Sequence, residues 1–140
     1  MYSTRKKFKM QGKTAAHQKQ LVKSIVTELI RNGRVKTTPA KAKVVKKYFD
    51  KLVTKAKKQT PGAQQKVASF FAENDRSIKR FAHIVETYLQ DRNSGYTRVI
   101  KTLPRKGDNA EQSYIMLVNF ELEKKKSKVK QLLEKREKNK

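Results

Sequence analysis

Apolar residues recur at helical spacing in four stretches of the 140-residue chain. The first helix is expected over residues 14–32, because Gly33 permits the left-handed conformation in which helices often end. The second is expected to begin at Thr38 and Pro39, a preferred cap followed by a proline suited to the first helical position. It reaches about Lys58 and carries apolar residues over half of its surface.

Two shorter helices are expected after a break at residues 60–62. One covers residues 63–72, and the other begins with a cap at residues 74–75. These segments contain Phe70, Phe71 and Phe81, whose rings could stack on bases. Their helical spacing on an amphipathic face instead favours a role in the core.

A different pattern occupies residues 96–103 and 113–120, which are rich in β-branched and aromatic residues and indicate the two arms of a long β-hairpin. The loop between them, PRKGDNAEQ, contains turn-forming residues at 107–109. The return arm is almost wholly apolar, so neither of its faces can be left in water and helices are expected to cover much of it. Residues 34–37 offer a short third strand.

These elements predict an α+β fold: four helices packed on a small antiparallel sheet built around the long β-hairpin, with a C-terminal helical extension. The expected organisation is a basic N-terminal arm over residues 1–13, a single α+β domain over residues 14–120, and a charged extension over residues 121–140.

Charge identifies the class of partner. The chain has 36 Lys and Arg residues against 12 Asp and Glu, a net charge of +24, and its pI is near 10.4. Such an excess repels itself unless a polyanion neutralises it, and nucleic acid is the obvious polyanion. An anionic membrane is the rival, but no apolar run approaches the length of a transmembrane helix, and the N-terminus lacks a signal-peptide apolar region. An intracellular protein without a membrane partner is therefore expected.

No catalytic constellation is recognisable. The chain has no cysteine and two isolated histidines, which makes a metal site improbable. It has no glycine-rich phosphate loop. Asp108 and Glu111 resemble an acid and base pair only superficially, since they lie in a turn where an aspartate is expected anyway. We therefore expect no enzyme activity, no cofactor, no metal and no small-molecule substrate.

Several basic segments are candidates for nucleic-acid contact. Residues 1–13 carry five cations without an acid, and are either solvated or an arm that orders on nucleic acid. The start of the second helix exposes backbone N–H groups between Lys36 and Lys41, which favours an anion site over a plain capped helix. Ten basic residues and one acid occur over residues 34–58, which indicates that the polar helix face meets a negative surface.

On the hairpin, alternation places Arg98 and Lys101 on opposite faces of the outgoing arm. Cations on both faces would fit an RNA that folds around the hairpin. Arg105 and Lys106 precede the turn, where Asp108 is expected to bond the backbone. The candidate RNA contacts are Arg5, Lys6, Lys7, Lys9, Lys13, His17, Lys19, Lys36, Thr37, Thr38, Lys41, Arg92, Tyr96, Arg98, Lys101, Arg105 and Lys106.

Two kinds of nucleic acid, DNA and folded RNA, are candidate partners. A DNA-binding or nucleoid-associated protein is the alternative, but the connection over residues 33–38 is too long for a helix-turn-helix, and the charge is not concentrated on one recognition helix. Folded RNA, which is approached from several sides through phosphates and 2′-hydroxyls, fits the distribution better.

The segments HQKQLVKSIVTELIRNGRVKTTPAKAK and RNSGYTRVIKTLPRKGDNAEQSYIMLV resemble the family of bacterial large-ribosomal-subunit protein seventeen, over about residues 13–120. The resemblance implies a cytoplasmic structural constituent of the ribosome. It implies contacts to large-subunit rRNA through residues 36–38, 95–98 and 105–109 and through the basic N-terminus. It also implies a site near the peptide exit region, beside other ribosomal proteins. Ser94 and Met116 depart from the family pattern, and residues 121–140 lie outside the match.

Overall fold

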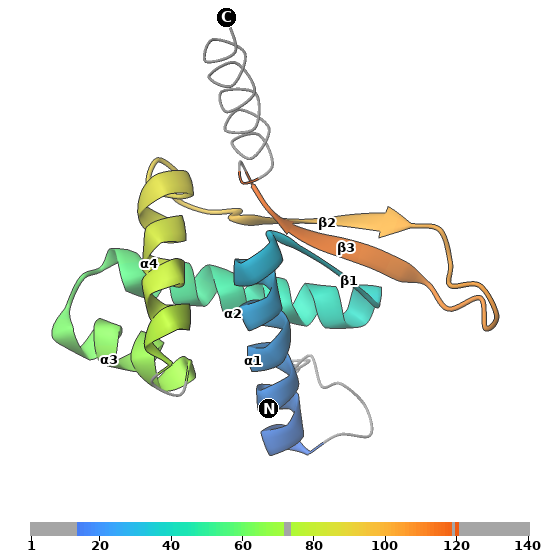
Figure 1. Ribbon diagram of the computed structural model, residues 1–140, viewed down its shortest axis with the longest axis horizontal. Coiled ribbons are helices and arrows are strands. Elements are labelled where there is room, and N and C mark those ends of the chain that lie inside the picture. Colours follow the sequence, from blue (N-terminus) through green and yellow to red (C-terminus); the bar gives the residue numbers. More distant parts are fainter. Residues whose placement is uncertain (1–13, 72–73, 119, 121–140) are drawn as a thin grey trace, which may run out of the picture.

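The computed structural model describes residues 14–71, 74–118 and 120. Over this part the chain is α+β, with four helices and a three-stranded antiparallel sheet, which confirms that part of the expected fold (Figure 1). The elements are α1 (Ala15–Asn32), β1 (Arg34–Thr37), α2 (Pro39–Lys57), α3 (Pro61–Phe70), α4 (Asp75–Tyr88), β2 (Thr97–Thr102) and β3 (Gln112–Leu117). The N-terminal arm and the C-terminal extension lie outside the described residues.

Local chemistry fixes both ends of α1 as the sequence predicts. The Thr14 hydroxyl accepts a hydrogen bond from the backbone N–H of His17 at 3.4 Å. Gly33 has a φ of +76°, and its N–H donates to the Leu29 carbonyl at 2.8 Å. A Cβ at Gly33 would lie 2.0 Å from Cδ1 of Phe120, so a larger residue would meet both backbone strain and a collision with that ring.

The third helix begins earlier than expected. The sequence treats residues 60–62 as a break, with the helix starting at 63, but Thr60 is the N-cap of α3 and Pro61 its first residue. This arrangement repeats the Thr38 and Pro39 start of α2, because a proline at the first position lacks only an N–H that the helix leaves unpaired there. Gln59, with a φ of +50°, turns the chain between the two helices.

The strand order is β1-β3-β2, so the apolar return arm is the central strand. Its residues alternate: Ser113, Ile115 and Leu117 are buried, whereas Tyr114 and Met116 are only partly so. The expectation that helices shield β3 from water on either side is therefore wrong for one side. Figure 1 shows α2 running beneath the sheet, and the alternation places Tyr114 and Met116 on the other, open face.

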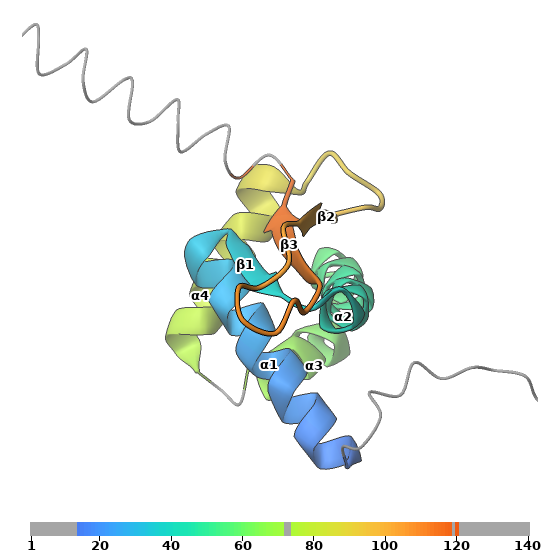
Figure 2. The same cartoon turned by 90° about the vertical axis from the view of Figure 1, so that its right-hand side faces the viewer.

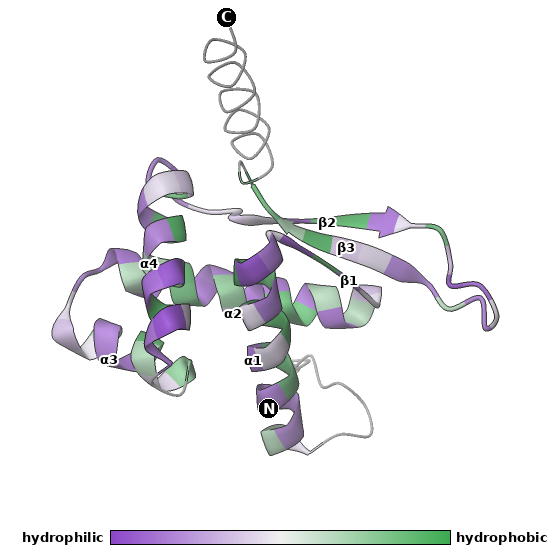
Figure 3. Cartoon of the chain, viewed as in Figure 1, coloured by the Kyte–Doolittle hydropathy of each residue, from purple (hydrophilic) through white to green (hydrophobic). Residues whose placement is uncertain are grey.

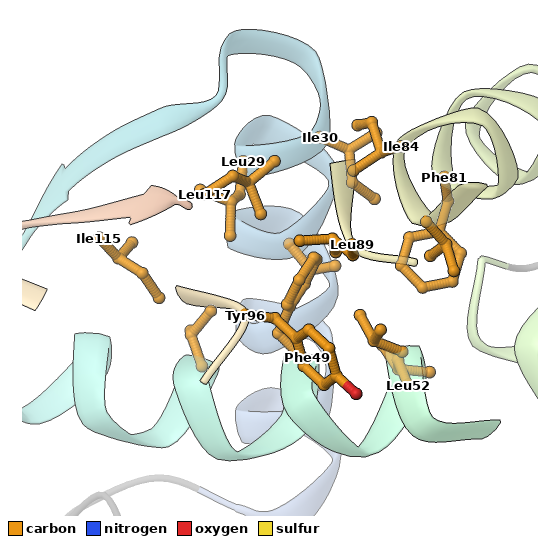
Figure 4. Packing of buried hydrophobic residues seen from close by; sticks show 14 of the residues in the cluster. Leu29, Ile30, Phe49, Leu52, Phe81, Ile84, Leu89, Tyr96, Ile115 and Leu117 are labelled. Atoms are coloured by element: carbon orange, nitrogen blue, oxygen red, sulfur yellow. The ribbon is translucent and has the colours of Figure 1, made fainter. Parts of the chain in front are cut away.

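The core lies between the sheet and the helices (Figure 4). Phe49 and Phe81 pack edge to face with ring centroids 5.9 Å apart. Phe71 and Phe81 are buried, which confirms their core role, and Phe70 packs against the cluster. Tyr48 belongs to the apolar spacing of the second helix, between the buried Val44 and Leu52, but it is 47% exposed.

Candidate nucleic-acid interface

The β2–β3 hairpin ends in a structured loop that projects past the helices (Figure 1). The Arg105 N–H donates to the Ala110 carbonyl at 2.9 Å, and the Asn109 N–H donates to the Arg105 carbonyl at 3.0 Å. Gly107 and Asn109 supply positive φ angles of 105° and 52°. The loop is thus held by its own backbone while its side chains stay in solvent.

Asp108 has two tasks in this loop. Its Oδ1 accepts a hydrogen bond from the backbone N–H of Ala110 at 3.3 Å, which confirms the predicted bond to the turn backbone. Its carboxylate also pairs with the Arg105 guanidinium, whose Nε donates to Oδ1 at 3.0 Å and whose second nitrogen donates to Oδ2. The hydrogen bond from Arg105 is the largest influence that lowers the pKa of Asp108 to about 2. The sequence interpretation missed this ion pair, although the three-residue spacing of opposite charges was its signal.

Arg98 and Lys101 occupy opposite faces of β2, as predicted. Arg98 stands opposite Met116 on the open face of the sheet, and Lys101 stands opposite the buried Ser113. Both cations are exposed. The hairpin therefore presents positive charge on its two faces and, through Lys106, at its tip.

The start of α2 keeps the features of an anion site. Thr38 has the extended backbone of an N-cap, but its side chain makes no capping hydrogen bond, so it does not occupy the exposed N–H groups. Lys36 is exposed, and Thr37 and Lys41 are partly buried close by in the chain. A phosphate at this point would meet the positive end of the helix dipole, with Lys36 two residues before the N-cap and Lys41 three residues after it in the chain.

The polar face of α2 is lined with lysines and carries one acid. Figure 3 shows hydrophilic residues along this helix and at the hairpin tip. Burial raises the pKa of the acid, Asp50, while Lys46 and the Tyr96 backbone N–H act in the opposite sense. Exposed lysines on the helix and at its C-cap are Lys43, Lys47, Lys51, Lys55 and Lys58.

Lys57 differs from these lysines. Its amino group donates to the carbonyl of Gln90 at 3.1 Å and to the carbonyl of Arg92, and it lies 5.0 Å from the centroid of the Tyr96 ring. It therefore ties the end of α2 to the segment that enters the hairpin, instead of facing a partner.

The remaining candidates are spread out. His17 and Lys19 are exposed and belong to the first turns of α1. Figures 1 and 2 show that this end of α1 lies away from the hairpin tip. Arg92 is partly buried. Tyr96 is 2% exposed, and its hydroxyl donates to the Asn93 carbonyl at 2.9 Å, so the structure places this residue in the core. The candidates Arg5, Lys6, Lys7, Lys9 and Lys13 lie outside the described residues.

The structure adds residues that the sequence interpretation did not select. The Arg34 guanidinium lies 5.9 Å from the centroid of the Tyr114 ring, which is the distance range of a cation–π contact. Period-two alternation along β3 was the available signal, since Tyr114 is out of phase with the buried Ser113, Ile115 and Leu117.

Other kinds of site receive no support from the described residues. No group of three or more histidine, aspartate or glutamate side chains is placed there to hold a metal ion. None of the helices in the described ranges is both long and apolar enough to cross a membrane. What the described residues do form is a basic hairpin beside a lysine-lined helix, a distribution of charge that favours a polyanion as partner.

Comparisons with known proteins specify the family. A family model described as ribosomal protein L17 matches residues 21–118. The large ribosomal subunit protein bL17 of Chlorobium phaeovibrioides is 43% identical over 109 residues, which are 78% of this chain and 61% of that relative. Its counterpart in Bacteroides thetaiotaomicron is 39% identical over 124 residues, 89% of this chain and 76% of the relative. The chain belongs to the ribosomal protein L17 family.

Proposed function

We propose that this protein is a structural constituent of the large ribosomal subunit, where it binds and stabilises folded large-subunit rRNA in the cytoplasm. Family membership supports the assignment to the ribosome, because the relatives are named as proteins of the large subunit. A position near the peptide exit region, beside neighbouring ribosomal proteins, is proposed from the family resemblance.

One observation carries the proposal of folded RNA as the ligand. Exposed cations lie on both faces of the hairpin, through Arg98 and Lys101, and also along α2. A single groove of a straight duplex can engage only one such surface, whereas an RNA that folds around the hairpin reaches all of them. The DNA-binding or nucleoid-associated alternative requires one dominant recognition surface, and the charge of this protein is not arranged in that way.

The remaining parts of the proposal concern the division of the chain into segments. Residues 14–120 form the rRNA-binding domain, residues 1–13 are a basic arm that contacts rRNA, and residues 121–140 are a charged extension. Within the domain, the proposed contacts are the exposed candidates of α1, the start of α2 and the hairpin. Tyr96 acts through the core instead.

Sedimentation of the full chain tests this function. Tagged protein expressed in a bacterium is expected to migrate with large subunits in a sucrose gradient and to stay on them through a moderate-salt wash. A variant with Lys36→Glu and Arg98→Glu is the comparison, and less of it is expected on the subunits. Both side chains are exposed, so reversal of their charge opposes phosphate binding without affecting the core. Migration with chromosomal DNA in place of the subunits would support the alternative.

A further inference from the structure

A groove lies between the C-terminal end of α2 and the helices α3 and α4, hereafter the α2–α3–α4 groove. Figure 1 shows these helices at the end of the molecule away from the hairpin tip. The volume of the groove is about 690 Å³. Its lining is largely apolar: Ala68 and Ile78 are half-buried, Ala82 is exposed, and the buried Phe81 and Val85 lie behind them. The groove therefore offers apolar surface that this chain leaves accessible.

The polar residues of the groove differ from those of the rest of the chain. Although 36 of the 140 residues are Lys or Arg, Lys57 is the one cation among the described residues that line the groove. Its amino group already donates to the carbonyls of Gln90 and Arg92. The rest of the polar lining consists of four amides and one carboxylate: Gln59, Gln64, Gln65, Gln90 and Glu86.

Exposed lysines on the same helices lie outside the groove. Lys58, Lys66 and Lys79 each adjoin a lining residue in sequence, and none of the three contributes to the lining. The helices thus turn their cations elsewhere and present a surface here that has no cation free for a phosphate. Because Lys and Arg hold the backbone of RNA, this surface is poorly suited to RNA. Depletion of charge around an apolar centre is instead characteristic of a protein interface.

We infer that the α2–α3–α4 groove docks a basic segment of a neighbouring protein of the large subunit. An apolar side chain of that segment packs against Ile78 and Ala82, and an adjacent lysine or arginine pairs with Glu86. Charge complementarity selects this occupant, because Glu86 is exposed and forms no ion pair within the described ranges. The glutamine amides both donate and accept, so they can bond the backbone of the segment. The inference rests on the proposed function and specifies the surface that meets a protein neighbour.

Photo-crosslinking in assembled subunits tests the occupant. The chain contains no cysteine, so Gln65→Cys places a single thiol in the groove, and Lys66→Cys places one on the adjacent exposed residue outside it. Each full-length variant is labelled with a benzophenone maleimide, assembled into large subunits and illuminated. The Gln65→Cys protein is expected to join another subunit protein in a product that survives ribonuclease, and Lys66→Cys is expected to give much less of it.

Mass spectrometry of the cross-linked peptide identifies the chemistry of the partner. The peptide is expected to carry an apolar residue next to a lysine or arginine. Cross-links from Gln65→Cys to rRNA or to a second copy of this chain would overturn the inference, and so would the absence of any cross-link.

Substitutions in the groove separate docking from RNA binding. Ala82→Gln fills part of the groove at an exposed position, and Thr87→Gln on the same helix is the control outside it. Ala82→Gln is expected to weaken association with subunits that lack this protein by about 10-fold, because the apolar side chain of the partner loses its place. Its affinity for an isolated rRNA transcript and its unfolding midpoint are expected to stay nearly unchanged. Equal association of the two variants with the subunits would overturn the inference.

The carboxylate allows a test in which docking and RNA binding predict opposite signs. Glu86→Gln and Thr87→Lys each make the chain more positive by one charge, so both would strengthen binding if the groove held RNA. Docking of a basic segment predicts that Glu86→Gln weakens association with the subunits by about 3-fold, whereas Thr87→Lys does not. Association of Glu86→Gln that equals or exceeds that of Thr87→Lys would contradict a basic partner.

Failure of this inference is distinguishable from failure of the proposed function. If the unaltered protein neither joins large subunits nor binds the rRNA transcript, the proposed function fails and the inference fails with it. If the unaltered protein joins the subunits, and Ala82→Gln joins them equally well without a protein cross-link from Gln65→Cys, only the docking groove is wrong.

Discussion

Arg105 and Asp108 face each other across the tip of the hairpin, where the guanidinium of the first donates to both carboxylate oxygens of the second. The same carboxylate accepts the Ala110 N–H, so a single side chain fixes both the turn and the arginine that precedes it. The basic tip is consequently a preformed shape, which reduces the entropy that a ligand must remove when it binds.

Titration of Asp108 tests this pair. Its folded-state pKa is lowered to about 2, chiefly by the hydrogen bond from Arg105. A depressed carboxyl pKa means that the pair orders the tip at pH values above the unfolded pKa of about 3.9 and loses this effect as the pH falls through about 2. NMR titration of the carboxyl carbon is expected to show the low pKa, and Arg105→Ala is expected to return it towards the ordinary value. An ordinary pKa in the unaltered protein would contradict the preformed tip.

Replacement of Arg98 tests the contact made by the hairpin strand. This side chain is exposed on the open face, so Arg98→Ala is expected to leave the unfolding midpoint nearly unchanged. The free energy of rRNA binding of this variant is expected to be less favourable by about 1.5–3 kcal/mol, because a charged hydrogen bond to phosphate is lost. Arg76→Ala, an exposed arginine in the first turns of α4, is the matched control, with a smaller expected loss. Equal losses in the two variants would indicate a diffuse charge effect in place of a specific contact.

Gly107→Val tests geometry without changing any charge. Gly107 has a φ of +105°, which a β-branched residue adopts only with strain, although no atom lies within 4 Å of the added Cβ. The variant is expected to distort the tip and reduce incorporation into subunits. The matched control is Gly62→Ala in α3, where the added Cβ also meets nothing within 4 Å and the φ is not positive, so incorporation is expected to be normal. Normal incorporation of Gly107→Val would mean that the shape of the tip is irrelevant.

Lys57 and Lys58 are adjacent lysines with different expected roles. Lys57 binds the carbonyls of Gln90 and Arg92 and lies over the ring of Tyr96, so Lys57→Ala is expected to lower the free energy of unfolding by about 1–3 kcal/mol. The exposed Lys58 makes none of these contacts, so Lys58→Ala is expected to be near neutral for stability. Chemical denaturation of both variants makes the comparison. A Lys57→Ala protein as stable as Lys58→Ala would show that the bridge from α2 to the hairpin contributes little.

Local chemistry was sufficient to predict most of the elements. The cap and stop signals of α1, the Thr38 and Pro39 start of α2 and the turn residues of the hairpin all act within a few residues of the chain, so the sequence displays them. The same reasoning failed at Pro61, because a threonine–proline pair directly after a helix is both a break and a new start.

Tertiary placement decided what local patterns could not. Tyr48 lies within the apolar spacing of α2, between the buried Val44 and Leu52, yet it is 47% exposed. Tyr96 was expected to contact RNA, yet its ring is buried in the core and its hydroxyl donates a hydrogen bond to the Asn93 carbonyl. The open face depends on which strand pairs with which, and the register of β1 on β3 links residues about 80 positions apart in sequence. No window of the chain reveals that Arg34 and Tyr114 are neighbours.

The salt dependence of rRNA binding tests the central claim most directly. If on the order of six or more phosphates are neutralised by Lys and Arg side chains, binding releases the corresponding counterions. The affinity of the full chain for a large-subunit rRNA transcript, measured across a range of salt concentrations, is then expected to give a log–log slope of roughly −5 or steeper. A nearly flat dependence would contradict the account, because the exposed cations of the hairpin, α2 and the open face would then not be the groups that hold the RNA.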